Sequence, residues 1–251
     1  MTWDTFLATK ETIPTGEGFP MFGLCHILWL CLAALVCVVL CLVYRRVSSQ
    51  IKSKILSIIA VLLLADELFK HIMLLIGGHW MIDYLPLHLC SINIFVCTAH
   101  AFRPTTAKSE FPYAVCLPAA LMALLFPSWT SLPFGNFMHM HSFTVHILLL
   151  LYPLLLLSGG YRPVPRHLKK VMISLLILCP PIYLLNKLTD SNFMFLNNPG
   201  NGNPLSLFEA FFGNPGYLIG MPILLVLIWF LLYLPFYLMA RGKKKAVSTV
   251  R

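Results

Sequence analysis

Charged side chains are scarce in this sequence. They make up 11% of its 251 residues, whereas a soluble domain carries about 25%. Hydrophobic residues make up 59%, and the mean hydropathy is +0.81. So little charge cannot cover the surface of a soluble globular enzyme, and it also excludes a disordered chain and a nucleic-acid-binding module.

Paired cysteines are lacking as well. The sequence has eight cysteines, and none of them forms a CxxC pair. Seven lie within apolar runs, where an unpaired cysteine packs like a small hydrophobic residue. We therefore expect free thiols and neither a bound metal nor a cofactor. Cys90 has polar neighbours and is the exception.

Long apolar runs dominate the rest of the chain, and each is long enough to cross a membrane as a helix. They predict an all-α membrane protein, a polytopic bundle that forms a single integral membrane domain over residues 1–251. The seven predicted spans are 21–44, 53–77, 82–102, 111–127, 137–158, 168–186 and 216–239. The fourth is short and contains several prolines, so whether it crosses fully is open.

The basic residues alternate along the predicted connections. Fifteen of the 18 Lys and Arg residues fall in the first, third and fifth loops and the tail, and only two fall in the other connections. Basic loops stay in the cytoplasm. This bias predicts an outside N-terminus and a cytoplasmic C-terminus, with the basic tail resting on anionic lipid. The net charge of +9 therefore indicates membrane orientation and not a nucleic-acid partner.

Ionisable residues inside the second span are functional candidates, because burying a charge in a membrane is costly. Asp66 and Lys70 are four residues apart, and so are Glu67 and His71. Each pair shares a helix face. The cluster either neutralises itself and holds the bundle together or forms the charged wall of a site.

The third and fifth spans begin with polar residues. The third carries His88, Cys90 and Asn93, and the fifth carries His139, His141 and His146. Three histidines in eight residues suggest zinc, but His139 and His141 diverge on a helix. We instead expect His146 to act as a base or proton relay, with the other two at the mouth of the site.

The sixth span ends in a third polar group, formed by Asn186, Asp190 and Asn192. A long loop rich in Asn, Gly and Pro follows, which is typical of a lid or a re-entrant segment. Counted at 1.5 Å per residue, the polar residues of four spans fall in one layer in the outer half of the bilayer. This layer predicts a water-accessible pocket open to the outside.

Several sequence blocks carry a family resemblance: LPLHLC at residues 85–90, NxxTxSNFMFL at 186–196 and GNPGY at 213–217. With these blocks the chain resembles the YwaF-like bacterial integral membrane family, which is similar to the transmembrane-protein-164 acyltransferases. The resemblance implies a bacterial plasma-membrane protein that acts on phospholipids, with Cys90 as the family cysteine and His146 as its histidine. Val145 stands where a serine is expected before that histidine.

The chemistry of these residues favours a membrane-embedded lipid acyltransferase or lipid hydrolase. Cys90 would attack an acyl ester, and His146 would be the base, with Glu67 or Asn186 orienting its ring. We expect membrane lipid as the substrate. The supporting or substrate-binding residues would be Glu67, Lys70, His71, His88, Asn93, His141, Asn186, Asp190 and Asn192.

A second hypothesis stays open at this point. A small-solute transporter or a ligand-binding membrane sensor would also place a polar pocket in the outer half of the bundle. The sequence does not identify the lipid donor, the acceptor or the oligomeric state.

Overall fold

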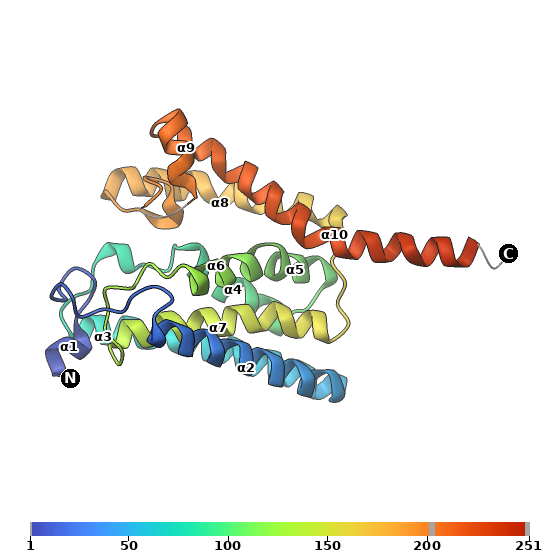
Figure 1. The fold of residues 1–251 in the computed structure, drawn as a ribbon, viewed down its shortest axis with the longest axis horizontal. Helices are drawn as coiled ribbons and strands as arrows, with labels where there is room; N and C mark the ends of the chain where they lie inside the picture. Colours follow the sequence, from blue (N-terminus) through green and yellow to red (C-terminus); the bar gives the residue numbers. More distant parts are fainter. Residues whose placement is uncertain (1, 201–203, 249–251) are drawn as a thin grey trace. The chain divides into compact units, whose positions relative to one another are not determined.

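The structure is a computed structural model that describes residues 2–200 and 204–248. It is 74% helix, with no strand in the described residues. The chain forms two compact units, residues 1–161 and 162–251 (Figure 1). That both units belong to one membrane domain stays a prediction.

The first unit holds the helices that carry most candidate residues. Its α-helices are α1 (Trp3–Leu7), α2 (Leu24–Arg46), α3 (Ser49–Ile76), α4 (Leu89–Phe102), α5 (Thr106–Phe111), α6 (Leu117–Leu125) and α7 (Phe137–Ser158). A 3₁₀ turn, η1 (Ile82–Tyr84), precedes α4, and a π-helical turn, η2 (Pro112–Cys116), joins α5 to α6.

Helix α7 is the centre of the first unit. It packs against α2, α3, α4 and α6, and α2 runs alongside it in Figure 1. Leu151, Tyr152 and Leu155 are fully buried on it. The polar side chains of α7 therefore point at neighbouring helices and not at lipid, which is where a polar site inside a membrane bundle is expected.

Asn136 fixes the start of α7. Its Oδ1 accepts hydrogen bonds from the backbone N–H groups of Met138 and His139, as an N-cap residue does. Its Nδ2 donates to the carbonyls of Thr5 and Ala8 in the N-terminal segment. One buried amide thus joins the N-terminal segment to the histidine-bearing end of α7.

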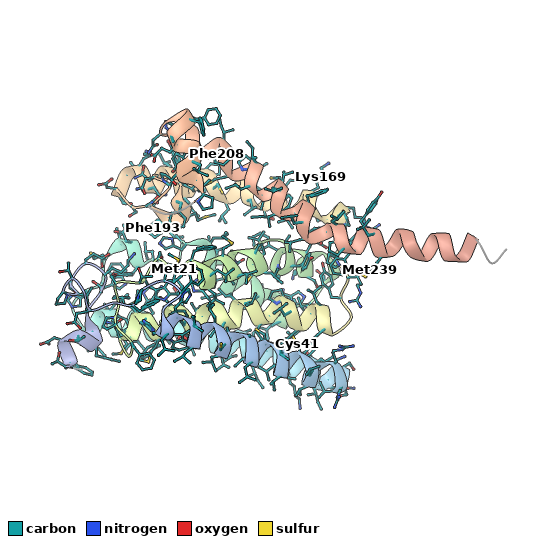
Figure 2. All side chains as sticks on the ribbon, in the orientation of Figure 1. Met21, Cys41, Lys169, Phe193, Phe208 and Met239 are labelled. Carbon is teal, nitrogen blue, oxygen red and sulfur yellow. The ribbon has the colours of Figure 1, made fainter. Side chains whose placement is uncertain are left out.

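The second unit consists of α8 (Leu168–Thr189), α9 (Leu205–Phe212) and α10 (Gly220–Ser248), with the turns η3 (Pro165–His167), η4 (Phe193–Phe195) and η5 (Gly216–Ile219). Phe208 of α9, labelled in Figure 2, packs on the start of α10. A Cβ at Gly220 would lie 2.5 Å from the Phe208 ring, so only glycine allows this approach.

Within the described residues, five segments are long and apolar enough to cross a membrane: Leu24–Arg46, Ile82–Phe102, Phe137–Ser158, Pro165–Thr189 and Gly216–Met239. Large apolar side chains on α2, such as Leu24 and Leu35, are exposed, as lipid-facing residues are. The chain is an integral membrane protein. The predicted spans 53–77 and 111–127 correspond to the charged helix α3 and to the broken segment α5–α6, so the number seven stays a prediction.

Candidate functional site

A buried ion pair lies on α3. Lys70 Nζ is 2.5 Å from Glu67 Oε1, and both side chains are less than one-tenth exposed. Ser91 of α4 donates to the same carboxylate oxygen at 3.3 Å, and His71 Nε2 lies 3.6 Å from it. Lys70 therefore pairs with Glu67, three residues away, and not with Asp66, with which it shares a helix face.

Asp66 faces α7 instead of Lys70. Its two carboxylate oxygens lie 3.2 and 3.3 Å from the Thr144 hydroxyl. His141 Nδ1 is 3.2 Å from Asp66 Oδ2, and His141 Nε2 is 3.9 Å from Glu67 Oε2. The two neighbouring carboxylates thus connect α3 to α7 through one histidine. His141 is buried in this cluster and does not lie at the mouth of a site.

Cys90 is the second residue of α4, because the chain before it is not α-helical. Tyr84 ends a 3₁₀ turn, and the residues from Leu85 to His88 lead into the helix without being part of it. His88 is the N-cap residue and provides no side-chain cap. The backbone N–H groups of Cys90 and Ser91 lie in the first turn of the helix, where N–H groups have no partner within the helix.

His146 is held by its own helix. Its Nδ1 lies 2.6 Å from the Ser142 carbonyl, which can only accept, so Nδ1 carries the proton and Nε2 is left as the basic nitrogen. Ser142 takes the orienting role that we expected of Glu67 or Asn186. The Trp129 ring stacks on the imidazole, with centroids 5.2 Å apart and planes 12° apart. In the described part of the chain, no hydrogen bond joins His146 to Cys90.

His139 belongs to a different environment. Its Nδ1 donates to the Leu132 carbonyl at 3.1 Å, and its Nε2 accepts from Trp29 Nε1 at 2.9 Å. Phe19 and Phe143 pack against the ring. Both ring nitrogens are occupied and the residue is fully buried, so His139 is a structural histidine.

The approach to α4 is anchored to the N-terminal segment. Tyr84 Oη donates to Glu11 Oε2 at 2.9 Å. Burial opposes ionisation of Glu11, but hydrogen bonds from Thr9 and Tyr84 outweigh it and lower the pKa of this carboxyl. The contact fixes the segment that leads directly to Cys90.

The three candidates from the sixth predicted span lie in the second unit. Asn186 donates to the Phe193 carbonyl and accepts from the Phe193 N–H, both at 2.9 Å. Asp190 ends α8 in the left-handed region, with φ 56°. Asn192 Oδ1 accepts from two backbone N–H groups of the following loop. These contacts shape the loop, and a substrate-binding role for the three residues stays a prediction. Residues 201–203 of the loop lie outside the described part.

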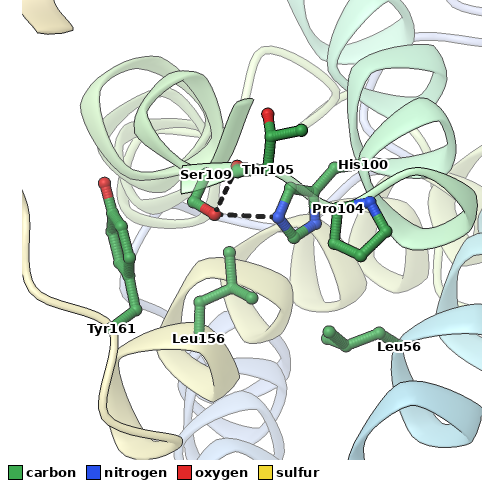
Figure 3. A pocket seen from close by; sticks show the side chains of 7 residues that line it. All are labelled: Leu56, His100, Pro104, Thr105, Ser109, Leu156 and Tyr161. Carbon is green, nitrogen blue, oxygen red and sulfur yellow. Dashed lines mark hydrogen bonds between the residues drawn. The ribbon is translucent and has the colours of Figure 1, made fainter. Parts of the chain in front are cut away.

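A second polar cluster lies near the other end of α4, about 15 Å from Cys90 at 1.5 Å per residue. His100 is bonded on both nitrogens, to Tyr152 at 2.8 Å and to Ser109 at 2.9 Å, and Ser109 also donates to the Thr105 carbonyl. If Tyr152 donates to Nδ1 and Nε2–H donates to Ser109, all three protons are satisfied. Figure 3 shows His100 and Ser109 on the wall of a cavity of about 360 Å³. This hydrogen-bonded chain connects α4, α5 and α7.

Some polar contacts gave little signal in the sequence. Ser91 and Thr144 bind the carboxylates of α3, and Trp129 covers His146. Ser91 directly follows Cys90, and Thr144 follows His141 by three residues on one helix face. These spacings could have identified Ser91 and Thr144 as residues of the site. No spacing identifies Trp129, because it lies in a loop.

A comparison with protein families gives one match. A model of the TMEM164 family matches residues 21–233, which is most of the chain. No curated protein and no solved structure matches the chain. The match spans α2 to α10 and includes the charged cluster, Cys90 and His146. The chain therefore belongs to the TMEM164 family.

Proposed function

We propose that this protein is a membrane-embedded lipid acyltransferase or lipid hydrolase in which Cys90 is the nucleophile and His146 is the base. The observation that carries the proposal is the position of Cys90 in the first turn of α4, among backbone N–H groups that have no partner within the helix. A helix N-terminus favours a thiolate. The same N–H groups are suited to the oxyanion that forms when a thiolate attacks an ester.

The reaction proceeds in two steps. The Cys90 thiol loses its proton to His146 Nε2, directly or through one water molecule, and the sulfur attacks the ester carbonyl carbon. The C–O bond breaks, and the leaving alcohol takes the proton from His146. A lipid alcohol or water then attacks the thioester, gives its proton to His146 and releases Cys90, which regains that proton. An alcohol as acceptor makes the protein a transferase, and water makes it a hydrolase.

Cys25 and His139 are another cysteine–histidine pair, but they cannot perform this chemistry. Cys25 Sγ lies 4.0 Å from His139 Nε2. That nitrogen already accepts a hydrogen bond from Trp29, and Nδ1 donates to a carbonyl. His139 has no free lone pair with which to take a proton, whereas His146 keeps Nε2 unbonded among the described residues. The free lone pair is the reason for choosing His146.

The charged cluster supports a role in holding the polar end of the lipid. Glu67, Lys70, His71 and His141 lie together on α3 and α7, and Ser91 connects them to the helix of Cys90. Lys70 is already bound to Glu67, so we assign oxyanion stabilisation to the α4 amides and not to Lys70. His88, as the N-cap of α4, would position those amides.

The proposal includes a membrane topology. We propose seven spans with an outside N-terminus in the bacterial plasma membrane of a YwaF-like protein, a site open to the outer leaflet, and a basic tail on anionic lipid. Its Arg251 lies outside the described residues. A single-cysteine reporter at Gly78 should react from outside, and one at Lys244 only after permeabilisation. Labelling at position 244 in intact cells would show that the chain has the opposite orientation, with the site on the cytoplasmic side.

Acyl exchange between lipids tests the proposed function. Purified protein in phospholipid vesicles should transfer labelled acyl chains or release them as fatty acid, and Cys90→Ala should abolish this activity. Cys25→Ala is the matched control, because Cys25 is also half-buried and beside a histidine. Full activity of the Cys90→Ala protein would exclude a Cys90 acyl intermediate, and solute flux without acyl exchange would favour a transporter.

A further inference from the structure

Two buried side chains near the proposed nucleophile and base lack hydrogen-bond partners. Both amide atoms of Asn93 are unpaired, and so is Trp129 Nε1. Asn93 is 1% exposed and Trp129 is 6% exposed. Unpaired buried polar groups cost folding free energy, and each one in a folded protein needs an explanation.

Comparable residues elsewhere in the chain are paired. Trp29 donates its indole N–H to His139, and Trp80 donates to His71. Asn136 and Asn186 use both the oxygen and the nitrogen of their side-chain amides. Asn93 and Trp129 therefore differ from these asparagines and tryptophans, whose polar atoms are paired.

The unpaired groups lie beside the two residues that the mechanism uses. Asn93 follows Cys90 by three residues on α4, so the two side chains share a face with Cβ atoms about 5–6 Å apart. The Trp129 indole is stacked on the His146 ring. Each member of the proposed pair thus has an unpaired hydrogen-bond donor next to it.

The chemistry of these donors defines what they can bind. An indole N–H only donates, so Trp129 needs an acceptor, and the Asn93 amide can both donate and accept. An acyl ester offers two acceptors, the carbonyl oxygen and the alkoxy oxygen. When a thiolate attacks the ester carbonyl carbon, the carbonyl oxygen becomes an oxyanion that hydrogen-bond donors near the nucleophile can bind, and the leaving oxygen lies beside the base.

We propose that Asn93 and Trp129 bind the acyl ester of the substrate. Asn93 Nδ2 donates to the carbonyl oxygen that becomes the oxyanion, and Trp129 Nε1 donates to the alkoxy oxygen that leaves beside His146. This assignment rests on the proposed function, and it names the acyl ester as the chemical group that the site recognises. It also gives each of the two buried donors a hydrogen-bond acceptor.

The test uses two apolar variants of the full-length protein, Asn93→Leu, which keeps the shape of the side chain, and Trp129→Phe, which is smaller. Asn93→Leu should raise the melting temperature, because it removes an unpaired buried group. Trp29→Phe is the matched control for Trp129→Phe: both lose the same side-chain volume, but only Trp29→Phe breaks a hydrogen bond, to His139, so it should lower the melting temperature more and leave acylation unchanged. A lower melting temperature for Asn93→Leu, with equal losses in Trp129→Phe and Trp29→Phe, would overturn the inference.

The second readout is acylation of the protein by 4-nitrophenyl octanoate. Asn93→Leu should slow acylation about 100-fold, as the loss of an oxyanion donor does. Trp129→Phe should slow it about 10-fold, the equivalent of one hydrogen bond. Wild-type rates in both variants would overturn the inference and leave the proposed function intact.

Binding of 2-decanone, a ketone without a leaving group, separates the two proposals. It should raise the melting temperature of the wild type and of Trp129→Phe, because a ketone has no alkoxy oxygen for Trp129 to bind, and it should not raise that of Asn93→Leu. If the wild type forms no acyl adduct but 2-decanone shifts the melting temperatures as predicted, the proposed function fails and the carbonyl-binding assignment holds. Equal shifts in all three proteins would refute the assignment.

Discussion

Replacing Lys70 by methionine should destabilise the protein markedly. The substitution keeps the volume of the side chain but leaves the Glu67 carboxylate buried without its cation. Breaking a buried ion pair in this way costs about 3–5 kcal/mol. Ser91 at 3.3 Å and His71 at 3.6 Å remain near the carboxylate and compensate in part, so we expect about 3 kcal/mol.

The effect is measurable as a change in melting temperature. At about 2–4 °C per kcal/mol for a chain of this size, Lys70→Met should lower the melting temperature in detergent by about 6–12 °C. The double variant Glu67→Met/Lys70→Met removes both charges and should be close to the wild type, since apolar residues replace buried ion pairs at little cost. Lys54→Met, at an exposed position of the same helix, should change stability by less than about 0.5 kcal/mol.

Two results would refute this reasoning. If Lys70→Met melted at the wild-type temperature, the pair would not be desolvated. If the double variant were as unstable as the single one, the loss would come from packing and not from an uncompensated charge.

Three further predictions concern the site and its surroundings. Cys90→Ser should retain the fold but lose most acyl exchange, because a hydroxyl is a far weaker nucleophile; near-normal exchange would contradict thiol chemistry. His146→Ala should lower the rate of acyl exchange at every pH tested and His141→Ala should lower it less, which kcat measured against pH would show. Equal losses in the two variants would contradict the role of His146 as the base. Because the folded-state pKa of Glu11 is lowered, its contribution to stability is present above the usual carboxyl pKa of about 4.3 and is lost as the pH falls through the folded-state value. Tyr84→Phe should therefore lower the melting temperature at pH 7 more than at pH 3, and an equal loss at both would contradict this.

The sequence predicts the helices well because they are read from long apolar runs. Predicted span 137–158 coincides with α7, and predicted span 168–186 lies within α8. The start of α4 was not predictable in the same way, because residues 82–88 fall within the predicted span 82–102 but form a 3₁₀ turn and further turns before the helix. Hydropathy reports burial in lipid and not backbone conformation.

The sequence indicated which polar residues lie on the same helix, but not which of them pair. Positions three and four residues apart are both neighbours on a helix, so spacing alone could not decide whether Lys70 binds Asp66 or Glu67. The position of α7 determines the partner of Lys70, because Thr144 and His141 of α7 lie against Asp66 and leave Glu67 to Lys70. The contact of Trp129 with His146 depends on the path of a loop, which no periodic pattern records.

The intact mass of the protein after incubation with a phospholipid extract tests the central claim most directly. A Cys90 acyl-enzyme predicts an added mass equal to one acyl chain, removable by hydroxylamine and mapped to the peptide that contains Cys90. It should be absent in Cys90→Ala and present in Cys25→Ala. Acyl exchange without any adduct on Cys90, or an adduct on another cysteine that persists in Cys90→Ala, would contradict the account.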